Sequence, residues 1–185
     1  MNGSYTKSEL IKIGVKKIGE NVKISRKASL YTPETMVFGD NVRIDDFSIL
    51  TGNITIGNNV HISAYTALYG KYGITIGNYC GCSPRCTLLS GSDDFSGEYM
   101  ISPMVPSNYT NVCGKKIVIN DFVQIGANSI IMPGVVVNEG AACGCFSFIK
   151  NDLSEWSIYA GIPAKKIKDR SKNIKCLAKR YEYEV

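Results

Sequence analysis

The chain has 185 residues, a length typical of one domain, with 20% charged residues, 44% hydrophobic residues and a formal net charge of +5. The charge is modest and no long run of lysine and arginine is present, which argues against a nucleic-acid-binding protein. No segment approaches the ~18 apolar residues of a membrane span. The polar segment 1–14 also lacks the apolar centre of a signal peptide, so we expect a cytoplasmic protein.

The first predicted element is a short helix over residues 4–13. Thr6 and Glu9 have the spacing of a capping box, in which the side chain of each residue accepts a hydrogen bond from the backbone N–H of the other. We assign residues 1–17 to a helical cap, because the open end of a stacked β-structure exposes backbone groups that need a cover.

A six-residue repeat begins at residue 18. The recurring apolar residues form six groups of three: Ile18, Ile24 and Leu30; Phe38, Ile44 and Leu50; Ile56, Ile62 and Leu68; Ile76, Cys82 and Leu88; Ile119, Ile125 and Ile131; and Val137, Cys143 and Ile149. A helix requires a period of about 3.6 and a half-buried strand a period of about 2, so neither explains the pattern. Three hexapeptides form one turn of three short flat strands, which predicts an all-β parallel β-helix over residues 18–168 with stacked aliphatic side chains in its core.

The repeat is interrupted by a long inserted loop over residues 89–116. The loop is rich in large apolar side chains: Phe95, Tyr99, Met100, Ile101, Met104, Val105 and Tyr109. A loop that is this long and apolar is usually functional or packed against another surface. After the second half of the repeat, residues 169–185 are predicted to form a C-terminal helix, because their apolar residues have helical spacing.

The seven cysteines do not indicate a metal site. Cys80, Cys82 and Cys86 cluster in the sequence without the CxxC pair that zinc sites usually contain, and a cytoplasmic location argues against disulfides. We therefore expect no metal, and interpret the cysteines as small buried residues at repeat positions.

Two segments of the second half of the repeat resemble the hexapeptide acyltransferase family. Residues 125–135, from Ile125-Gly126-Ala127 to Gly134-Val135, are similar to the characteristic coil of the family, and residues 159–167 (YAGIPAKKI) are similar to its closing A-G-x-P-A-K-x-I segment. Within the family, residues 90–99 and 105–112 resemble sugar acetyltransferases, in particular those acting on nucleotide-linked aminodideoxy sugars of bacterial surface glycans. The resemblance implies a left-handed β-helix, a homotrimer with active sites between neighbouring subunits, and acetyl-CoA as co-substrate.

The resemblance also implies a coenzyme site along the C-terminal coils. The matching positions are Ala127, Cys145, Lys150, Lys165 and Lys168. The small residues would allow the pantetheine arm to approach the backbone, and the lysines would attract the phosphates of the coenzyme. The alternative is that these lysines are only a solvated face.

The inserted loop lacks the catalytic histidine that many sugar O-acetyltransferases of this family carry. Ser92 stands at that position, and His61, the only histidine of the chain, is expected to point outward from another coil, as a base or as a surface side chain. A sugar hydroxyl needs a general base, whereas a sugar amine with a pKa near about 8 is partly neutral at pH 7. The absence therefore favours N-acetylation over O-acetylation, with Asp93, Asp94 and Glu98 as candidates to orient the ammonium and accept its proton.

Three aromatic residues of the loop, Phe95, Tyr99 and Tyr109, are candidates to stack on the nucleotide or sugar, or else to anchor the loop on a neighbouring subunit. Other functions remain as alternatives: an O-acetyltransferase using His61 or a water molecule, or a non-catalytic trimeric scaffold. A zinc enzyme of the carbonic-anhydrase type needs three histidines per metal, more than one histidine per chain supplies. The sequence leaves open the sugar, the carbon position, the nucleotide and the length of the acyl group.

Overall fold

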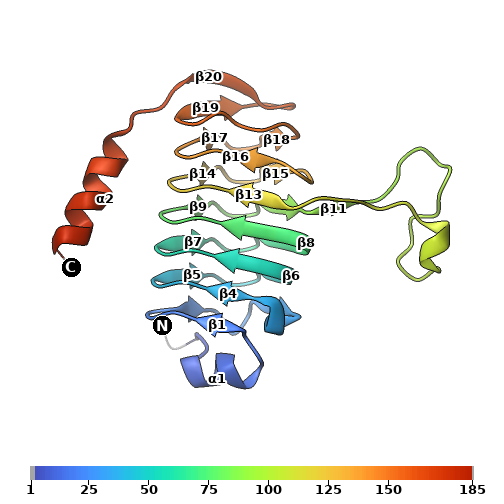
Figure 1. The fold of residues 1–185 in the computed structure, drawn as a ribbon, viewed down its shortest axis with the longest axis horizontal. Helices are drawn as coiled ribbons and strands as arrows, with labels where there is room; N and C mark the ends of the chain where they lie inside the picture. Colours follow the sequence, from blue (N-terminus) through green and yellow to red (C-terminus); the bar gives the residue numbers. More distant parts are fainter. Residues whose placement is uncertain (1–2, 185) are drawn as a thin grey trace.

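The computed structural model describes residues 3–184, which form a left-handed parallel β-helix with a helix at each end and one projecting arm (Figure 1). The elements are α1 Lys7–Lys12, β1 Lys17–Ile18, β2 Lys23–Ile24, β3 Ser29–Tyr31, η1 Pro33–Thr35, β4 Val37–Phe38, β5 Val42–Ile44, β6 Ile49–Ile56, β7 Val60–Ile62, β8 Ala67–Ile76, β9 Gly81–Cys82, β10 Thr87–Leu89, β11 Gly91–Ser92, η2 Ser107–Tyr109, β12 Cys113–Gly114, β13 Ile117–Ile119, β14 Gln124–Ile125, β15 Ile130–Ile131, β16 Val136–Val137, β17 Ala142–Cys143, β18 Phe148–Ile149, β19 Ser157–Ala160, β20 Lys165–Asp169 and α2 Asn173–Glu184. No helix in this part of the chain is long and apolar enough to cross a membrane.

Parallel pairing places each inward residue above its equivalent in the preceding coil. The second face of the stack, formed by β2, β5, β7, β9, β14, β17 and β19, shows this most simply, since Ile44 pairs with Ile62, Ile62 with Cys82, and Cys82 with Ile125. The predicted groups of three are therefore the core, and all of them are buried except Ile18 and Leu30, which are half-buried in the first coil at the open end of the stack. The predicted fold class is confirmed.

The corners of the stack are built from residues in the left-handed backbone region. At the first corner, between the first and second faces, Asn41 and Asn59 have φ values of 55° and 57°, which asparagine tolerates well. In later coils aromatic residues take this place, and each such residue costs about 1–3 kcal/mol of strain. The stacking of Tyr79 on Phe122, with ring centroids 5.2 Å apart, offsets part of that cost.

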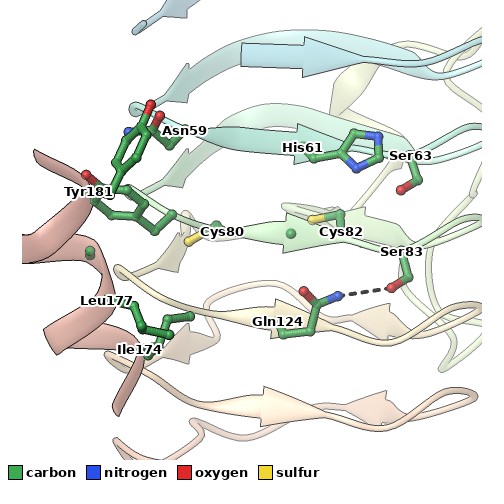
Figure 2. A pocket seen from close by; sticks show the side chains of 13 residues that line it. Asn59, His61, Ser63, Cys80, Cys82, Ser83, Gln124, Ile174, Leu177 and Tyr181 are labelled. Carbon is green, nitrogen blue, oxygen red and sulfur yellow. Dashed lines mark hydrogen bonds between the residues drawn. The ribbon is translucent and has the colours of Figure 1, made fainter. Parts of the chain in front are cut away.

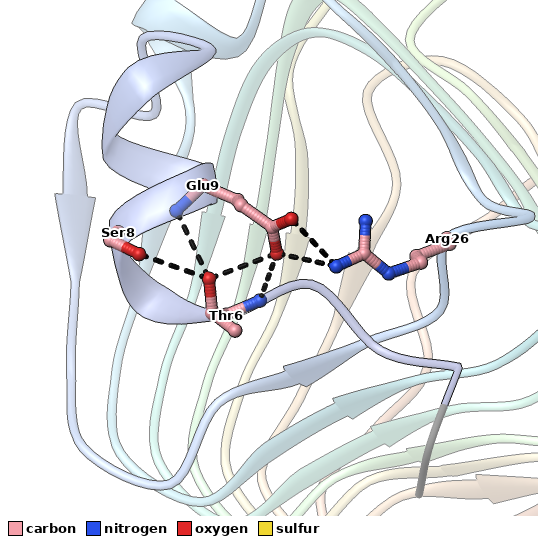
Figure 3. A network of polar contacts seen from close by, with 4 residues as sticks. All are labelled: Thr6, Ser8, Glu9 and Arg26. Atoms are coloured by element: carbon pink, nitrogen blue, oxygen red, sulfur yellow. Dashed lines mark hydrogen bonds and ion pairs between the residues drawn. The ribbon is translucent and has the colours of Figure 1, made fainter.

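The N-terminal end of the stack is covered by α1 (Figure 3). Its capping box is confirmed: Glu9 N–H donates to the Thr6 hydroxyl at 3.3 Å, and Thr6 N–H donates to the Glu9 carboxylate at 2.8 Å. Arg26, on the first coil, donates to both carboxylate oxygens of Glu9 at 2.6 Å. The helix is shorter than the predicted 4–13, because Thr6 is its N-cap.

The C-terminal end is closed by a returning strand that the repeat does not predict. β20 pairs antiparallel with β19 and covers the last edge of the second face. The chain then runs back along the stack as α2, which falls within the predicted helical segment 169–185 (Figure 1). Met1, Asn2 and Val185, at the outer ends of the predicted terminal segments, lie outside the described residues.

The inserted loop forms an arm that leaves the stack on the side away from α2 (Figure 1). β11 and β12 pair antiparallel at its base, where Gly91 lies opposite Gly114. Both glycines are required by close packing, since a Cβ at Gly114 would lie 2.3 Å from the ring of Tyr72, and one at Gly91 would lie 2.8 Å from it. Further out, the side chain of Phe95 is 91% exposed.

Replacing Glu9 by glutamine is expected to lower the thermal stability at neutral pH but not in strong acid. The hydrogen bonds from Arg26 and Thr6 lower the pKa of Glu9 from 4.5 to about 2. A depressed carboxyl pKa gives stability that is complete above the ordinary value and is lost as the pH falls through the folded value. The difference in melting temperature, measured by circular dichroism, should therefore shrink between pH 5 and about pH 2.

The matched control is Glu34→Gln, which replaces an exposed glutamate with no hydrogen bond or ion pair in residues 3–184. This variant should melt like the parent protein at every pH. An equal melting-temperature loss for Glu9→Gln at pH 7 and pH 2.5 would contradict the assigned role of the charge.

Candidate active site

A groove of about 590 Å³ runs along the outside of the second face and is walled by α2 (Figure 2). Three successive coils contribute to it, through β7, β9, β14 and the turns that flank them. The residues that line it are Asn59, His61, Ser63, Tyr79, Cys80, Gly81, Cys82, Ser83, Gln124, Ile174, Leu177, Ala178 and Tyr181. The groove lies here because α2 runs back along the stack, beside the outside of the second face (Figure 1).

The row of outward positions on the second face explains the shape of the groove. His61 pairs with Gly81 in the next coil, and Gly81 pairs with Gln124 in the coil after that. A Cβ at Gly81 would lie 2.6 Å from Oε1 of Gln124, so the missing side chain creates the gap between the two polar residues. Gln124 Nε2 donates to the hydroxyl of Ser83 at 3.0 Å. The groove therefore presents hydroxyl, amide and imidazole groups around an open centre.

His61 is oriented by a carboxylate, as a histidine that handles protons often is. Its Nε2 lies 2.7 Å from Oδ2 of Asp45, and Oδ1 of Asp45 accepts from Nε of Arg43 at 2.6 Å. Partial burial opposes the charge of Asp45, but these hydrogen bonds from Arg43 and His61 hold its pKa below the ordinary value. A carboxylate only accepts hydrogen bonds, so the proton lies on Nε2 and Nδ1 of neutral His61 is an acceptor.

The other wall of the groove is the apolar side of α2. Ile174, Leu177 and Tyr181 face the second face of the β-helix (Figure 2). The helix is held at its far end by the hydroxyl of Tyr79, which donates to Oε1 of Glu182 at 2.6 Å. This hydrogen bond raises the pKa of Tyr79 to about 12. The groove thus has one polar and one apolar wall, which suits a ligand with both kinds of surface.

The cysteines of the groove floor are poor nucleophiles. Cys80 and Cys82 are buried, and burial raises the pKa of the Cys80 thiol to about 12 and that of Cys82 well above its ordinary value. The prediction that the cysteines are buried holds for four of them and is wrong for Cys113, Cys145 and Cys176, which are exposed because they lie in the arm, at a corner and on α2. In residues 3–184 no group of three or more His, Cys, Asp and Glu residues is arranged to hold a metal ion.

The predicted coenzyme residues fall into three places. Ala127 and Cys145 lie at the second corner, between the second and third faces, in successive turns directly beyond the turn of Ser83. The backbone is close-packed there, since a Cβ at Gly126 would lie 2.5 Å from the backbone nitrogen of Cys145. This corner therefore forms a close-packed track of backbone that leads from the turn of Ser83 toward the C-terminal end.

The three predicted lysines are exposed and lie away from this corner. Lys165 and Lys168 belong to β20, which pairs with β19 above the second face. Lys150 lies at the third corner, between the third and first faces, where it borders a small depression with Lys115 and Asp152. The structure therefore places Lys165 and Lys168 near one another and Lys150 apart from them.

The predicted catalytic aspartates lie at the base of the arm. Oδ1 of Asp94 accepts hydrogen bonds from the hydroxyl and the backbone N–H of Ser96, and its Oδ2 accepts from Asn111 across the arm at 3.0 Å. Those from Ser96, and secondarily the one from Asn111, lower the pKa of Asp94, against a small opposing effect of burial. Asp94 therefore links two segments of the arm through these hydrogen bonds, which favour its charged form. Asp93 is exposed and borders two depressions of the arm.

Within one chain the arm residues do not reach the groove. Tyr99 borders a depression of about 570 Å³ with both aspartates, while Glu98 and Tyr109 are exposed beside it, and none of these residues lines the groove. His61 is thus separated from Asp93 and Asp94 in the single chain.

Sequence reasoning missed the residues that surround His61. Asp45, Ser63, Ser83 and Gln124 were not singled out, although the register of the repeat places all of them on the same face. The available signal was the repeat itself, because residues at equivalent outward positions of successive coils lie side by side on the folded surface.

Comparison with known proteins identifies related chains. A family model described as bacterial transferase hexapeptide (six repeats) matches residues 35–70. The dTDP-4-amino-4,6-dideoxy-D-glucose acyltransferase of Escherichia coli is 43% identical over 169 residues, which cover 90% of this chain and 88% of that enzyme.

Solved structures of one enzyme match the whole chain. AntD, an N-acyltransferase from Bacillus cereus, in complex with dTDP and 3-hydroxybutyryl-CoA, is similar with a TM-score of 0.96 and 45% identity over 100% of this chain and 98% of that one. A serine-to-cysteine variant of AntD in complex with dTDP-4-amino-4,6-dideoxyglucose and coenzyme A gives a TM-score of 0.97 and 45% identity, with both chains covered fully.

The seven thiols are expected to react in two classes. With a disulfide reagent at pH 8, Cys113, Cys145 and Cys176 should react rapidly, whereas Cys80, Cys82, Cys86 and Cys143 should react only after denaturation, because they are buried and their pKa values are raised. Peptide mass mapping after timed labelling measures this directly. Rapid native labelling of Cys80 or Cys82 would show that the groove floor is open to reagents and chemically active.

Proposed function

The chain belongs to the family of hexapeptide-repeat acyltransferases, and on that premise we propose that it transfers the acyl group of acyl-coenzyme A to the amine of a nucleotide-linked amino-dideoxy sugar. Acetyl-CoA is the proposed donor, and dTDP-4-amino-4,6-dideoxyglucose is the proposed acceptor, in cytoplasmic synthesis of a surface-glycan precursor. The observation that carries the proposal is the full-length similarity, at 45% identity and a TM-score of 0.97, to an N-acyltransferase bound to this sugar nucleotide and coenzyme A.

The reaction is a direct displacement. The neutral amine attacks the thioester carbonyl, a C–N bond forms as the C–S bond breaks, and coenzyme A leaves as a thiolate that is protonated as the new amide loses its extra proton. The amine is partly neutral at pH 7, so holding the amine and the thioester in contact supplies much of the rate enhancement. The carbonyl oxygen gains negative charge in the transition state, and a backbone N–H at the second corner would stabilise it.

The arm carboxylates have separable roles in this proposal. Asp93 is exposed and is proposed to accept a hydrogen bond from the sugar ammonium and orient it for attack. Asp94 is already bonded to Ser96 and Asn111, so it is proposed to fix the arm and to add negative charge near the amine. Glu98, Tyr99 and Tyr109 remain proposed contacts for the nucleotide sugar.

We propose a homotrimer because the two parts of the proposed site, the arm and the groove, lie apart in a single chain. In a ring of three identical subunits, each interface joins two different surfaces of the chain, so the arm of one subunit would meet the groove of the next. The arm supports this arrangement, since it extends away from its own stack with 91% of Phe95 and 90% of Met104 exposed (Figure 1).

A second candidate function is O-acylation of a sugar hydroxyl. It is favoured by one observation, the 2.7 Å contact between His61 Nε2 and Asp45, which leaves Nδ1 as an acceptor within the groove. A hydroxyl requires such a base, and loss of a general base typically costs about 10²- to 10⁴-fold in rate. The two candidates therefore make opposite predictions for His61→Ala.

The purified protein is expected to acetylate the amine of dTDP-4-amino-4,6-dideoxyglucose and to leave the 4-hydroxyl counterpart unchanged. His61→Ala should keep kcat/KM for the amine within about tenfold of the parent, because a neutral amine attacks without first losing a proton to a base. The measurement follows free thiol release and product mass with acetyl-CoA and, in parallel, 3-hydroxybutyryl-CoA. Turnover of the hydroxyl sugar that disappears in His61→Ala would refute N-acylation and establish the second candidate.

Mixing two inactive variants is expected to restore activity if the site is shared between subunits. Gly81→Leu fills the groove, and Asp93→Ala removes the proposed ammonium contact from the arm. In randomly mixed trimers about a quarter of the interfaces combine an intact groove with an intact arm. Co-expression followed by purification of the mixed oligomer should recover about that fraction of the parent activity. Mixed oligomers with no activity above either variant would place both halves in one chain.

A further inference from the structure

Four residues at the second corner form a continuous stack that the roles described above do not use. Lys27 Nζ lies 5.4 Å from the ring centre of Phe47, Phe47 stacks on Tyr65 with centroids 5.0 Å apart, and Cζ of Arg85 lies 5.5 Å from the ring centre of Tyr65. We call Lys27, Phe47, Tyr65 and Arg85 the corner stack. Both aromatic rings are about half exposed, at 47% and 53%.

The backbone of the corner creates this stack. Phe47, Tyr65 and Arg85 have φ values of 60°, 61° and 61°, so equivalent residues of three coils leave the corner in the same direction. Left-handed backbone is costly for residues other than glycine, at about 1–3 kcal/mol each. The stacking of Phe47 and of Arg85 on Tyr65 offsets part of that cost and holds the three side chains in place.

Arg85 differs from the other cations near this corner because its charge is not neutralised. Lys27 donates to Asp46 at 3.1 Å, and Arg43 donates to Asp45 at 2.6 Å. In the part of the chain that the structure describes, Arg85 has no carboxylate within ion-pair distance. Its guanidinium is held over the ring of Tyr65, so little freedom remains to be lost when it binds an anion. Such a group suits the paired oxygens of a phosphate.

Arg85 lies close to the groove and to the proposed coenzyme track. It lies in the turn between β9 and β10 with Ser83, which lines the groove. The next two turns at the same corner contain Ala127 and Cys145, the proposed track of the coenzyme, whose own phosphates would meet the lysines of β20 farther along. The sugar nucleotide that accepts the acyl group carries a diphosphate of its own. This diphosphate must lie on the side of the reacting amine that faces away from the coenzyme.

We propose that Arg85, held in place by Tyr65, binds the diphosphate of the nucleotide-linked sugar. This assignment rests on the proposed function and adds to it the group that anchors the acceptor. The sugar would extend from Arg85 into the groove beside Ser83, where the thioester arrives from the opposite direction along the corner. Tyr65 is a positioning residue in this arrangement, and Arg85 contacts the substrate.

Arg85→Ala is expected to raise KM for dTDP-4-amino-4,6-dideoxyglucose about 10- to 100-fold, the loss typical of a hydrogen bond between charged groups. The KM for acetyl-CoA should stay within about twofold. Arg85→Lys should recover only part of the affinity, because lysine lacks the planar paired donors. Tyr65→Phe keeps the ring and should therefore have the KM values of the parent. Tyr65→Ala should raise KM for the sugar nucleotide, as Arg85→Ala does, but by a smaller factor.

Arg26→Ala is the matched control. Arg26 also lies over a tyrosine, with Cζ 5.3 Å from the ring centre of Tyr5, but its charge is neutralised by Glu9. Its substitution should leave both KM values unchanged. Unchanged KM for the sugar nucleotide in Arg85→Ala would overturn the inference, and so would an increase confined to acetyl-CoA, which would assign Arg85 to the coenzyme.

A binding measurement separates this inference from the proposed reaction. Thymidine diphosphate alone, titrated calorimetrically, should bind the parent protein about 10- to 100-fold more tightly than Arg85→Ala. This result would support the diphosphate site even if no amino sugar were acylated, in which case only the proposed function would fail. Equal affinity for the two proteins, or no binding to either, would overturn the inference whatever the activity.

Discussion

The rest of the structure depends on the parallel pairing of each coil with the next one. This pairing places equivalent residues in rows, on the outside of the stack as well as in its core. The register that stacks Ile62 on Cys82 also aligns His61 with Gly81 and Gln124, and so forms the groove. Extra residues are absorbed at the third corner, where the pairing of β6 with β8 shifts between Gly52 and Ile54. The functional surface can therefore vary without disturbing the core.

The sequence predicts the parts of the fold that repeat or that use a local signal. The ladders follow from the six-residue period, and the cap at Thr6 and Glu9 follows from their spacing. The return of β20 along β19 and the docking of α2 on the second face have no counterpart in any repeat, so they were not predicted. Both depend on contacts between segments far apart in the chain, such as that between Tyr79 and Glu182.

The candidate site was predicted less completely, for a related reason. An outward direction for His61 follows from its place before Ile62, but its partner Asp45 lies in another coil and carries no motif. Equally, Asp93 and Asp94 look alike in the sequence, and only the structure shows that the carboxylate of Asp94 is hydrogen-bonded to Ser96 and Asn111. Side-chain roles depend on neighbours that become adjacent only when the coils stack.

The groups that line the groove also restrict the chemistry that it can support. A thiol attacks as a thiolate, and the pKa of Cys80, raised by burial to about 12, disfavours a covalent acyl-cysteine. Ser83 accepts a hydrogen bond from Gln124, and in residues 3–184 no hydrogen bond joins it to His61, so it lacks the adjacent base that activates a serine. The attacking electron pair must then come from the acceptor. An amine supplies one at neutral pH without further activation, which is why direct transfer to an amine fits this groove better than a covalent intermediate.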